Sequence, residues 1–438
     1  MLARILRHRA ATRSETAMHD LAAPSVAAHA AQPADAPAAT PGHIEKGTAL
    51  FRRTNWALFA AGFATFALLY CVQPMLPVFS AAFTLSAAQS SLALSVSTIA
   101  LAIGLLFTGP LSDALGRKPV MVAALLAAAL CTLLAALMPS WHGLLVMRAL
   151  LGLALSGLVA VAMSYLSEEI HPLHLGLAMG LYISGNALGG MSGRLLSGVL
   201  VDFVSWQAAL ASLGLLGLGA ALLFWRLLPE SRHFRATPLN LGNLAAGLRL
   251  HFSDRGLPWL FLEAFLLMGG FVTLFNYIGY RLLEAPYGMG QAFVGLLSVV
   301  YLSGTYSSTQ AGVLADRLGR HRVFWPAILL MLTGALLTLA EPLPVVLGGM
   351  LLFAFGFFAA HSLASSWVGR RALKARGQAA SLYLFSYYAG SSVAGTAGGL
   401  FWARAGWDGV AGFIAVLLGV ALLVALHLSR LPPRQAQG

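Results

Sequence analysis

Charged side chains are scarce in this 438-residue chain: Asp, Glu, Lys and Arg make up 10% of it, whereas 58% of its residues are hydrophobic. Soluble globular domains carry about 25% charged residues. Most of the chain therefore does not face water, which excludes an ordinary soluble protein. The composition instead indicates a membrane protein whose main partner is the lipid bilayer.

Cysteine and clustered catalytic groups are also lacking. Cys71 and Cys131 lie inside apolar stretches and give neither a disulfide framework nor the spacing of a metal site. The ATP-binding frame G-x-x-x-x-G-K-[ST] does not occur, which argues against ATP-driven transport. His, Asp and Glu are scattered, without a clustered nucleophile or acid pair. The sequence thus predicts no enzyme, no cofactor and no metal.

The apolar residues fall in long runs. A bilayer-spanning helix needs about 20 mostly apolar residues, and twelve such runs follow one another from Asn55. The longest internal loop, 229–257, divides them into two sets of six. We therefore expect an all-α membrane protein with 12 transmembrane helices in two pseudo-symmetric six-helix bundles. The runs are 55–79, 88–112, 119–138, 141–166, 175–200, 206–228, 258–281, 291–315, 323–340, 343–367, 377–401 and 408–428.

The basic residues set the expected orientation. The formal net charge of +12 is spread over short clusters in alternate loops, which does not fit a nucleic-acid-binding face. The opposite loops hold only Arg281 and Arg404. Cytoplasmic loops are enriched in Lys and Arg, so both termini are expected in the cytoplasm, with the protein in the inner (plasma) membrane. The expected parts are a disordered cytoplasmic tail (1–54), an N-terminal bundle (55–228), a central cytoplasmic loop (229–257), a C-terminal bundle (258–428) and a cytoplasmic tail (429–438).

A charged turn with the frame G-x-x-x-D-x-x-G-R lies between two apolar runs and recurs about 200 residues later. Its glycines allow a tight reversal, and its Asp and Arg can pair where the helices leave the membrane. Two copies in matching positions indicate an internally duplicated membrane protein. The two copies comprise Gly109, Asp113, Gly116, Arg117 and Lys118, and then Gly312, Asp316, Gly319 and Arg320.

The fifth and eleventh runs repeat as well. Gly176 and Gly377 open similar segments, and the same offset of 201 residues pairs Gly189 with Gly390. A 6+6 duplication with a charged turn between the second and third helices of each half resembles the major facilitator superfamily. The resemblance implies a secondary transporter that works by alternating access. It also implies that each charged turn is a latch against the other half that holds the outward-facing state.

Within that superfamily the chain is similar to bacterial drug:proton antiporters, including the acriflavin-sensitivity branch. Arg148-Ala-Leu-Leu-Gly152 matches the R-x-x-x-G motif of the fourth helix. The antiporter pattern of the fifth helix departs at Gly190, which stands for a Pro, and at Arg194, which stands for a Gly. The glycines that fit the pattern recur every four residues and form one helix face: Gly185, Gly189 and Gly193.

Three residues inside apolar runs are candidates for proton coupling. The resemblance assigns Arg148 this role, and the alternative is a structural hydrogen bond to helix carbonyls. Glu263 is the only acid well within an apolar run, and the alternative is a shallow residue paired with Arg255. His361 can also titrate, although a lone membrane histidine is commonly part of a hydrogen-bonded structure. Arg194 is either a substrate anchor or a partner of Glu263.

The predicted function is proton-coupled efflux of small organic compounds or drugs by a monomer. Arg148 and Arg194 outnumber Glu263 in the membrane, so uptake or facilitated movement of an organic anion is the first alternative. A sugar transporter and a non-transporting sensor are further alternatives. The candidates for the lining of the substrate cavity are polar and aromatic residues of five runs: Tyr70, Gln73, Tyr182, Asn186, Arg194, Asn276, Tyr277, Tyr301 and Tyr383.

Overall fold

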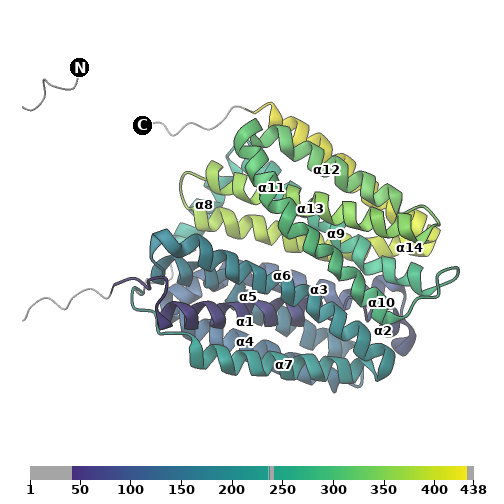
Figure 1. Ribbon diagram of the computed structural model, residues 1–438, viewed down its shortest axis with the longest axis horizontal. Coiled ribbons are helices and arrows are strands. Elements are labelled where there is room, and N and C mark those ends of the chain that lie inside the picture. The colour runs from purple at the N-terminus through teal and green to yellow at the C-terminus, as the bar shows by residue number, and fades with distance from the viewer. Residues whose placement is uncertain (1–41, 235, 237–240, 432–438) are drawn as a thin grey trace, which may run out of the picture. The chain divides into compact units, whose positions relative to one another are not determined.

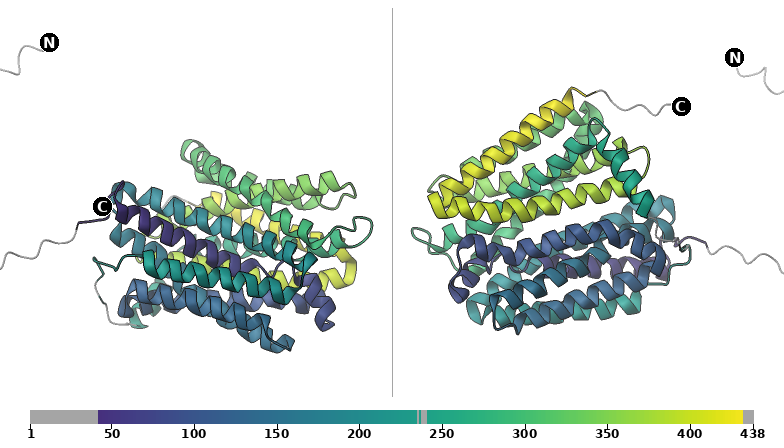
Figure 2. Two further views of the ribbon diagram at one scale, coloured as in Figure 1. Left: turned by 60° about the horizontal axis from the view of Figure 1, so that its bottom comes forward. Right: turned by 180° about the vertical axis from the view of Figure 1, so that it is seen from behind.

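The computed structural model describes residues 42–234, 236 and 241–431. Residues 1–41 of the predicted disordered tail lie outside the described residues. The described residues form helices, together with one isolated β-bridge between Ile44 and Ile170. Figure 1 shows two groups of roughly parallel helices, α1–α7 and α9–α14, and both views of Figure 2 keep these groups distinct.

The first group holds the N-terminal half of the chain. Its first helix begins earlier than position 55 because the hydroxyl of Thr48 accepts a hydrogen bond from the backbone N–H of Phe51 and caps the helix there. The helices are α1 (Ala49–Tyr70), α2 (Leu76–Phe83), α3 (Ala87–Leu115), α4 (Arg117–Ala136), α5 (Trp141–Glu169), α6 (Pro172–Phe203) and α7 (Trp206–Leu227).

The second group holds the C-terminal half, and the short helix α8 precedes it. Within α14 the helical backbone is broken at Ala405 and Gly406, where the sequence predicts a tight turn between the last two spans. The elements are α8 (Leu241–Phe252), α9 (Leu257–Leu283), α10 (Gln291–Leu296), the 3₁₀ helix η1 (Leu297–Tyr301), α11 (Leu302–Leu318), α12 (Arg320–Leu337), α13 (Leu343–Arg371) and α14 (Arg376–Ser429).

The predicted fold class is confirmed. Each of the twelve apolar runs corresponds to one helix, one interrupted helix or one part of α14. Seven helices of the described chain are long and apolar enough by themselves to cross a membrane. The other spans are interrupted or contain more glycine, polar or charged residues, as α6 and α12 do.

One span in each half is interrupted. The first run breaks after Tyr70, because Pro74 has no N–H to donate and its ring would clash with the carbonyl four residues earlier. The chain resumes as α2, which carries Pro77 in its first turn. In the other half, the eighth run is divided into α10, η1 and α11 by the 3₁₀ segment that ends at Tyr301.

The two halves repeat the same close helix crossing. A Cβ atom at Gly189 of α6 would collide with the carbonyl of Phe63 in α1, and one at Gly390 of α14 would collide with that of Phe265 in α9. The backbones therefore touch, which only glycine allows. The repeat offset read from the sequence thus corresponds to a repeated packing arrangement.

The halves meet mainly along two helix pairs, α3 with α14 and α6 with α10, and α2 also contacts α9. The following hydrogen bonds between the halves lie toward the end of the helices opposite the charged turns. Ser80 and Tyr280 share one of 2.7 Å, and Ser392 donates one of 2.8 Å to the carbonyl of Ser95. Asp202 accepts from the backbone N–H groups of Gln291 (2.8 Å) and Ala292 (2.7 Å). Polar contacts thus join the halves at this end of the molecule.

Candidate functional site

The break in α1 is held by Arg148 of α5, whose side chain is only 1% exposed. It donates to the carbonyls of Ala93 (2.8 Å), Leu68 (2.9 Å) and Leu69 (2.6 Å). Two of these carbonyls belong to the last turn of α1, where no helical N–H follows to satisfy them. Arg148 therefore makes the hydrogen bonds of the structural alternative, and its role in proton coupling stays a prediction.

Arg194 of α6 lies next to both interruptions. Its guanidinium carbon is 4.3 Å from the ring centre of Tyr70, the last residue of α1, and 4.9 Å from that of Tyr301, the last residue of η1. Its Nη1 donates to the carbonyl of Gly190 at 2.7 Å. A cation near two aromatic rings is stabilised by their π electrons. The interruptions thus meet at a buried positive charge.

Gln73 joins this charge to the other half. It lies in the gap between α1 and α2, where its Oε1 accepts from Nε of Arg194 at 2.6 Å. Its Nε2 donates to Oδ1 of Asn276 in α9 at 2.8 Å. One amide therefore links α6 of one half to α9 of the other. Five of the nine cavity candidates come together here, and we call them the central site: Tyr70, Gln73, Arg194, Asn276 and Tyr301.

Within the described chain, Arg194 forms no ion pair, and its bonds do not involve Glu263. Thirteen positions of α9 separate Glu263 from Asn276, which is about 20 Å at the rise of an α-helix. Pairing between Arg194 and Glu263, one of the two roles considered for Arg194, is therefore not formed in this state.

A second group of candidates lies around Glu263, which is 0% exposed. Neither of its carboxyl oxygens has a hydrogen-bond partner among the described residues. Glu263 is close enough to Tyr383 of α14 for an electrostatic interaction, and the Tyr383 hydroxyl is 2.9 Å from Nδ1 of His361 in α13. Tyr383 thus contacts one coupling candidate, His361, and interacts electrostatically with a second, Glu263.

The remaining cavity candidates serve helix packing. The hydroxyl of Tyr277 donates to the carbonyl of Gly395 at 2.7 Å and joins α9 to α14. Tyr182 and Asn186 of α6 face Gly62 of α1, where a Cβ atom would collide with the Asn186 side chain. Tyr277 shares the Gly395 carbonyl with Asn276 of the central site, whereas the contacts of Tyr182 and Asn186 lie between helices of the N-terminal half.

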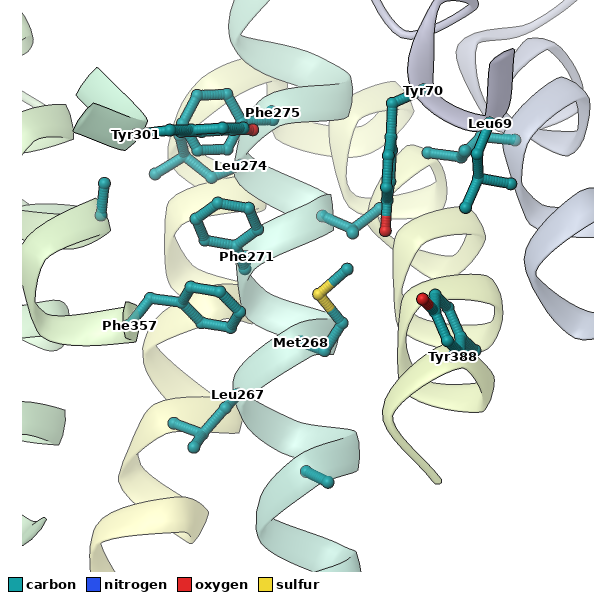
Figure 3. Close-up of a cluster of buried hydrophobic side chains, with 14 of the residues drawn as sticks. Leu69, Tyr70, Leu267, Met268, Phe271, Leu274, Phe275, Tyr301, Phe357 and Tyr388 are labelled. Carbon is teal, nitrogen blue, oxygen red and sulfur yellow. The ribbon is translucent and has the colours of Figure 1, made fainter. Parts of the chain in front are cut away.

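Sequence reasoning missed Tyr387 and Tyr388. The ring of Tyr387 is 4.7 Å from that of His361 and 5.1 Å from that of Tyr388. In Figure 3 the hydroxyls of Tyr388 and Tyr70 point toward the same space beside Met268. These tyrosines connect the central site with the Glu263 group. The repeat offset offered a signal, because Tyr387 is the counterpart of the candidate Asn186.

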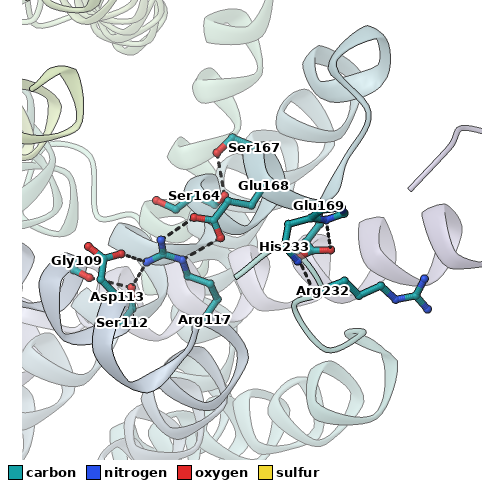
Figure 4. Close-up of polar contacts among 10 residues, drawn as sticks. All are labelled: Gly109, Ser112, Asp113, Arg117, Ser164, Ser167, Glu168, Glu169, Arg232 and His233. Atoms are coloured by element: carbon teal, nitrogen blue, oxygen red, sulfur yellow. Dashed lines mark hydrogen bonds and ion pairs between the residues drawn. The ribbon is translucent and has the colours of Figure 1, made fainter. Parts of the chain in front are cut away.

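The first charged turn is a closed network (Figure 4). Arg117 contacts Asp113 at 2.5 Å and donates to Glu168 at 2.6 Å and to the Ser112 hydroxyl at 2.6 Å. Gly116 has a φ of +99°, which favours glycine. The turn is therefore fixed to the last turn of α5.

Neighbouring contacts extend this network to the loop after α7. Lys118 pairs with Glu230 at 2.8 Å. Glu169, adjacent to Glu168, accepts from the backbone N–H groups of Arg232 (2.7 Å) and His233 (2.9 Å). The first turn is thereby tied to the start of the segment that joins the two halves.

The second charged turn is looser. Asp316 is 3.6 Å from Arg320 and 3.5 Å from Arg370, and its side chain is 64% exposed. Gly319 repeats the positive φ of the first turn, at +90°. A Cβ atom at Gly109 or at Gly312 would meet nothing within 4 Å. Both Asp–Arg pairs thus lie within their own halves, and the latch between halves stays a prediction.

Comparison with known proteins identifies relatives along most of the chain. Residues 58–307 and 282–438 match the family described as Major Facilitator Superfamily. The inner membrane transport protein YnfM of Escherichia coli K12 is 62% identical over 88% of this chain and 93% of its own length. The uncharacterized MFS-type transporter YybF of Bacillus subtilis 168 is 49% identical over 89% and 96%. A crystal structure of a bacterial homologue of the human lysosomal transporter Spinster, inward-facing and occupied, shares the fold with a TM-score of 0.71, at 15% identity over 88% of this chain and 98% of that one.

Proposed function

Because the chain belongs to the major facilitator superfamily and is a multi-pass membrane transporter rather than an enzyme, we propose that it exports small organic compounds in exchange for protons. The proposal places it in the inner membrane as a monomer with cytoplasmic termini. The single observation that carries it is Glu263, a fully buried acid whose two oxygens lack partners among the described residues.

A buried carboxyl group without a donor is costly as an anion. Such an acid inside a membrane is by default a candidate for carrying protons. The Tyr383 hydroxyl and Nδ1 of His361 lie 2.9 Å apart, which is close enough for a proton to pass between them, and Glu263 acts electrostatically on Tyr383. Glu263 is the proton carrier in this scheme, and its carboxyl group must rotate to bond to Tyr383 before a proton can pass to that pair.

The central site is where the compound binds. It lies at two interrupted helices, and transporters of inverted-repeat architecture bind substrate at such interruptions near the middle of the bilayer. Gln73 contacts Arg194 of one half and Asn276 of the other. A compound that competes for these bonds acts on both halves at once, as alternating access requires.

The contacts between the halves support this cycle. They join the end opposite the charged turns, which faces the periplasm in the proposed orientation. Asp113 and Asp316 pair within their own halves, which leaves the latch between the halves open. Under this proposal, the contacts support a state closed to the outside, and the latch forms when the protein opens outward.

The test uses proteoliposomes with an imposed pH gradient, a panel of cationic dyes, organic anions and pentoses, and a pH dye inside. Wild type is expected to move protons with at least one compound. Glu263→Gln is expected to abolish the accumulation of that compound while exchange without a gradient continues. Glu341→Gln, at an exposed acid between α12 and α13, is the matched control. Accumulation by Glu263→Gln equal to wild type excludes Glu263 as the carrier, and flux indifferent to pH excludes proton coupling.

A further inference from the structure

We propose that the transported compounds are organic anions, and that Arg194 binds their carboxylate group at the central site. This inference rests on the proposed function, because it concerns the same site and names its substrate class. It is independent of how protons are carried, since Glu263 lies elsewhere along α9.

The first argument is an unbalanced charge. Arg194 is 5% exposed, forms no ion pair within the described chain, and uses only Nε and Nη1 for hydrogen bonds. A guanidinium group has five N–H donors, so Nη2 has no partner among the described residues. A buried charge normally has a counter-charge, because desolvation is otherwise too costly. A carboxylate supplies both the counter-charge and the acceptors.

The second argument is an unused donor next to this charge. The Tyr301 hydroxyl is buried without a hydrogen-bond partner in the described chain, although the ring of the same residue lies 4.9 Å from the guanidinium carbon of Arg194. A buried polar group left unpaired is destabilising, because it has lost its hydrogen bonds to water. Two unused donors at one place, with no acid paired to Arg194 among the described residues, match an oxyanion and oppose a cation.

The surroundings indicate what the carboxylate is attached to. The ring of Phe275 lies 4.9 Å from that of Tyr301, and Phe271 lies 5.3 Å from it. Figure 3 shows these rings together on the α9 side of the site. Aromatic walls of this kind pack against a planar apolar body. The favoured compound is therefore a carboxylate on an aromatic or similarly flat apolar skeleton.

Gln73 occupies the place beside Arg194 that the anion would take. Its neutral Oε1 accepts from Nε of Arg194 at 2.6 Å. A charged carboxylate makes hydrogen bonds about twice as strong as a neutral acceptor does, so it displaces Gln73 from Arg194. Gln73 also donates to Asn276 of the other half. Binding of the anion thus changes the one amide that links the two halves here.

The experiment measures binding to purified protein and counterflow in proteoliposomes, with benzoate, its neutral amide benzamide and the cation benzylamine as matched probes. Wild type is expected to bind and exchange benzoate at least tenfold better than the other two. Arg194→Gln should lose this preference by tenfold or more. Arg194→Lys should retain part of it, because the charge stays while the forked geometry is lost. Tyr301→Phe tests the second donor without a change of charge, and the exposed Arg404→Gln is the control.

The outcomes separate the two proposals. Benzoate exchange that depends on Arg194 but moves no protons supports the anion site and overturns proton coupling. Proton-coupled movement of benzylamine, unchanged in Arg194→Gln, overturns the anion site and leaves proton coupling intact. Equal binding of benzoate and benzamide, or binding of neither, also overturns the anion site.

Discussion

The two halves share one plan of helices but differ in where their ionisable groups lie. The N-terminal half holds Arg148 and Arg194 in its interior, whereas the C-terminal half holds Glu263 and His361. Counted from the first residues of α5 and α13, the counterpart of Arg148 is Met350, which is fully buried. The duplicated scaffold thus carries cations in one half and titratable groups in the other.

This difference accompanies a difference in the first helix of each half. The α1 helix stops at Tyr70 and exposes carbonyls that Arg148 satisfies, whereas α9 continues without a break from Leu257 to Leu283. No arginine is needed opposite α9, because its carbonyls are bonded within the helix. The break after α1 positions Gln73 for the central site. The continuous helix α9 carries both Glu263 and Asn276.

The largest expected effect comes from making the halves alike. Arg148→Met places the residue of the C-terminal half at the matching position and removes the guanidinium donors from the carbonyls of Leu68 and Leu69 at the end of α1. Each unsatisfied buried group costs about 1–3 kcal/mol, so we expect the free energy of unfolding of the detergent-purified protein to fall by about 2 kcal/mol or more. Met350→Leu is the control and should cost less than about 1.5 kcal/mol. Equal stability of the two variants contradicts the capping role of Arg148.

The next largest effect on stability tests the close helix crossing that the two halves share. Gly189→Ala and Gly390→Ala each bring a Cβ atom against a carbonyl of the neighbouring helix. Forcing extra volume into such a contact costs about 1–3 kcal/mol, and we expect similar losses of thermal stability in both halves. Gly176→Ala and Gly377→Ala are the controls, because a Cβ there meets nothing within 4 Å. A large loss in only one half would show that the packing is not equivalent.

Much of this fold can be predicted from the sequence, because hydropathy and the internal duplication are patterns that extend over whole helices. The twelve spans, the paired charged turns and the glycine crossing at Gly189 and Gly390 all come from patterns repeated along the chain. The break at Tyr70 was missed within the run 55–79, although Pro74 and Pro77 were visible. A long apolar run hides such a break, since an interrupted span remains apolar.

The candidate site was harder to predict for a physical reason. The partners of Arg148 are backbone carbonyls of α1 and α3, and no residue type marks a carbonyl in a sequence. The pairing of Gln73 with Arg194 depends on the gap after α1, which brings an otherwise ordinary amide to the charge. Residue identities indicated which groups were unusual, and only the packing of helices determined which of them meet.

A third test compares the two charged turns. Asp113→Asn removes an anion that is 43% exposed and lies 2.5 Å from Arg117, whereas Asp316→Asn removes one that is 64% exposed and lies 3.6 Å from Arg320. Transport by Asp113→Asn is expected to fall about tenfold or more, equivalent to about 1.4 kcal/mol, with membrane insertion unchanged. Asp316→Asn should have a smaller effect, because exposed ion pairs contribute little. Normal transport by well-inserted Asp113→Asn excludes the first turn as a latch, and equal losses contradict the ranking.

The smallest effect concerns how the first helix of each half begins. The α1 helix is capped by the neutral Thr48, whereas Asp254 precedes α9 and accepts at 2.8 Å from the backbone N–H groups of both Gly256 and Leu257 and at 2.5 Å from Arg371. Burial raises the pKa of Asp254, but these donors outweigh it and hold the pKa below its ordinary value.

Because the pKa of Asp254 is lower in the folded protein, its ionised side chain stabilises the fold fully above about pH 3.9, the pKa of Asp in the unfolded chain. This stabilisation is lost as the pH falls through the pKa of the folded state. Between pH 6 and pH 3, we expect the free energy of unfolding of wild type to fall by about 1 kcal/mol more than that of Asp254→Asn. This is the usual contribution of a helix cap. Thr48→Ala should lower stability by a similar amount at every pH, because a hydroxyl does not titrate there. If wild type and Asp254→Asn have parallel stability curves down to pH 3, Asp254 does not contribute to the acid sensitivity of the C-terminal half.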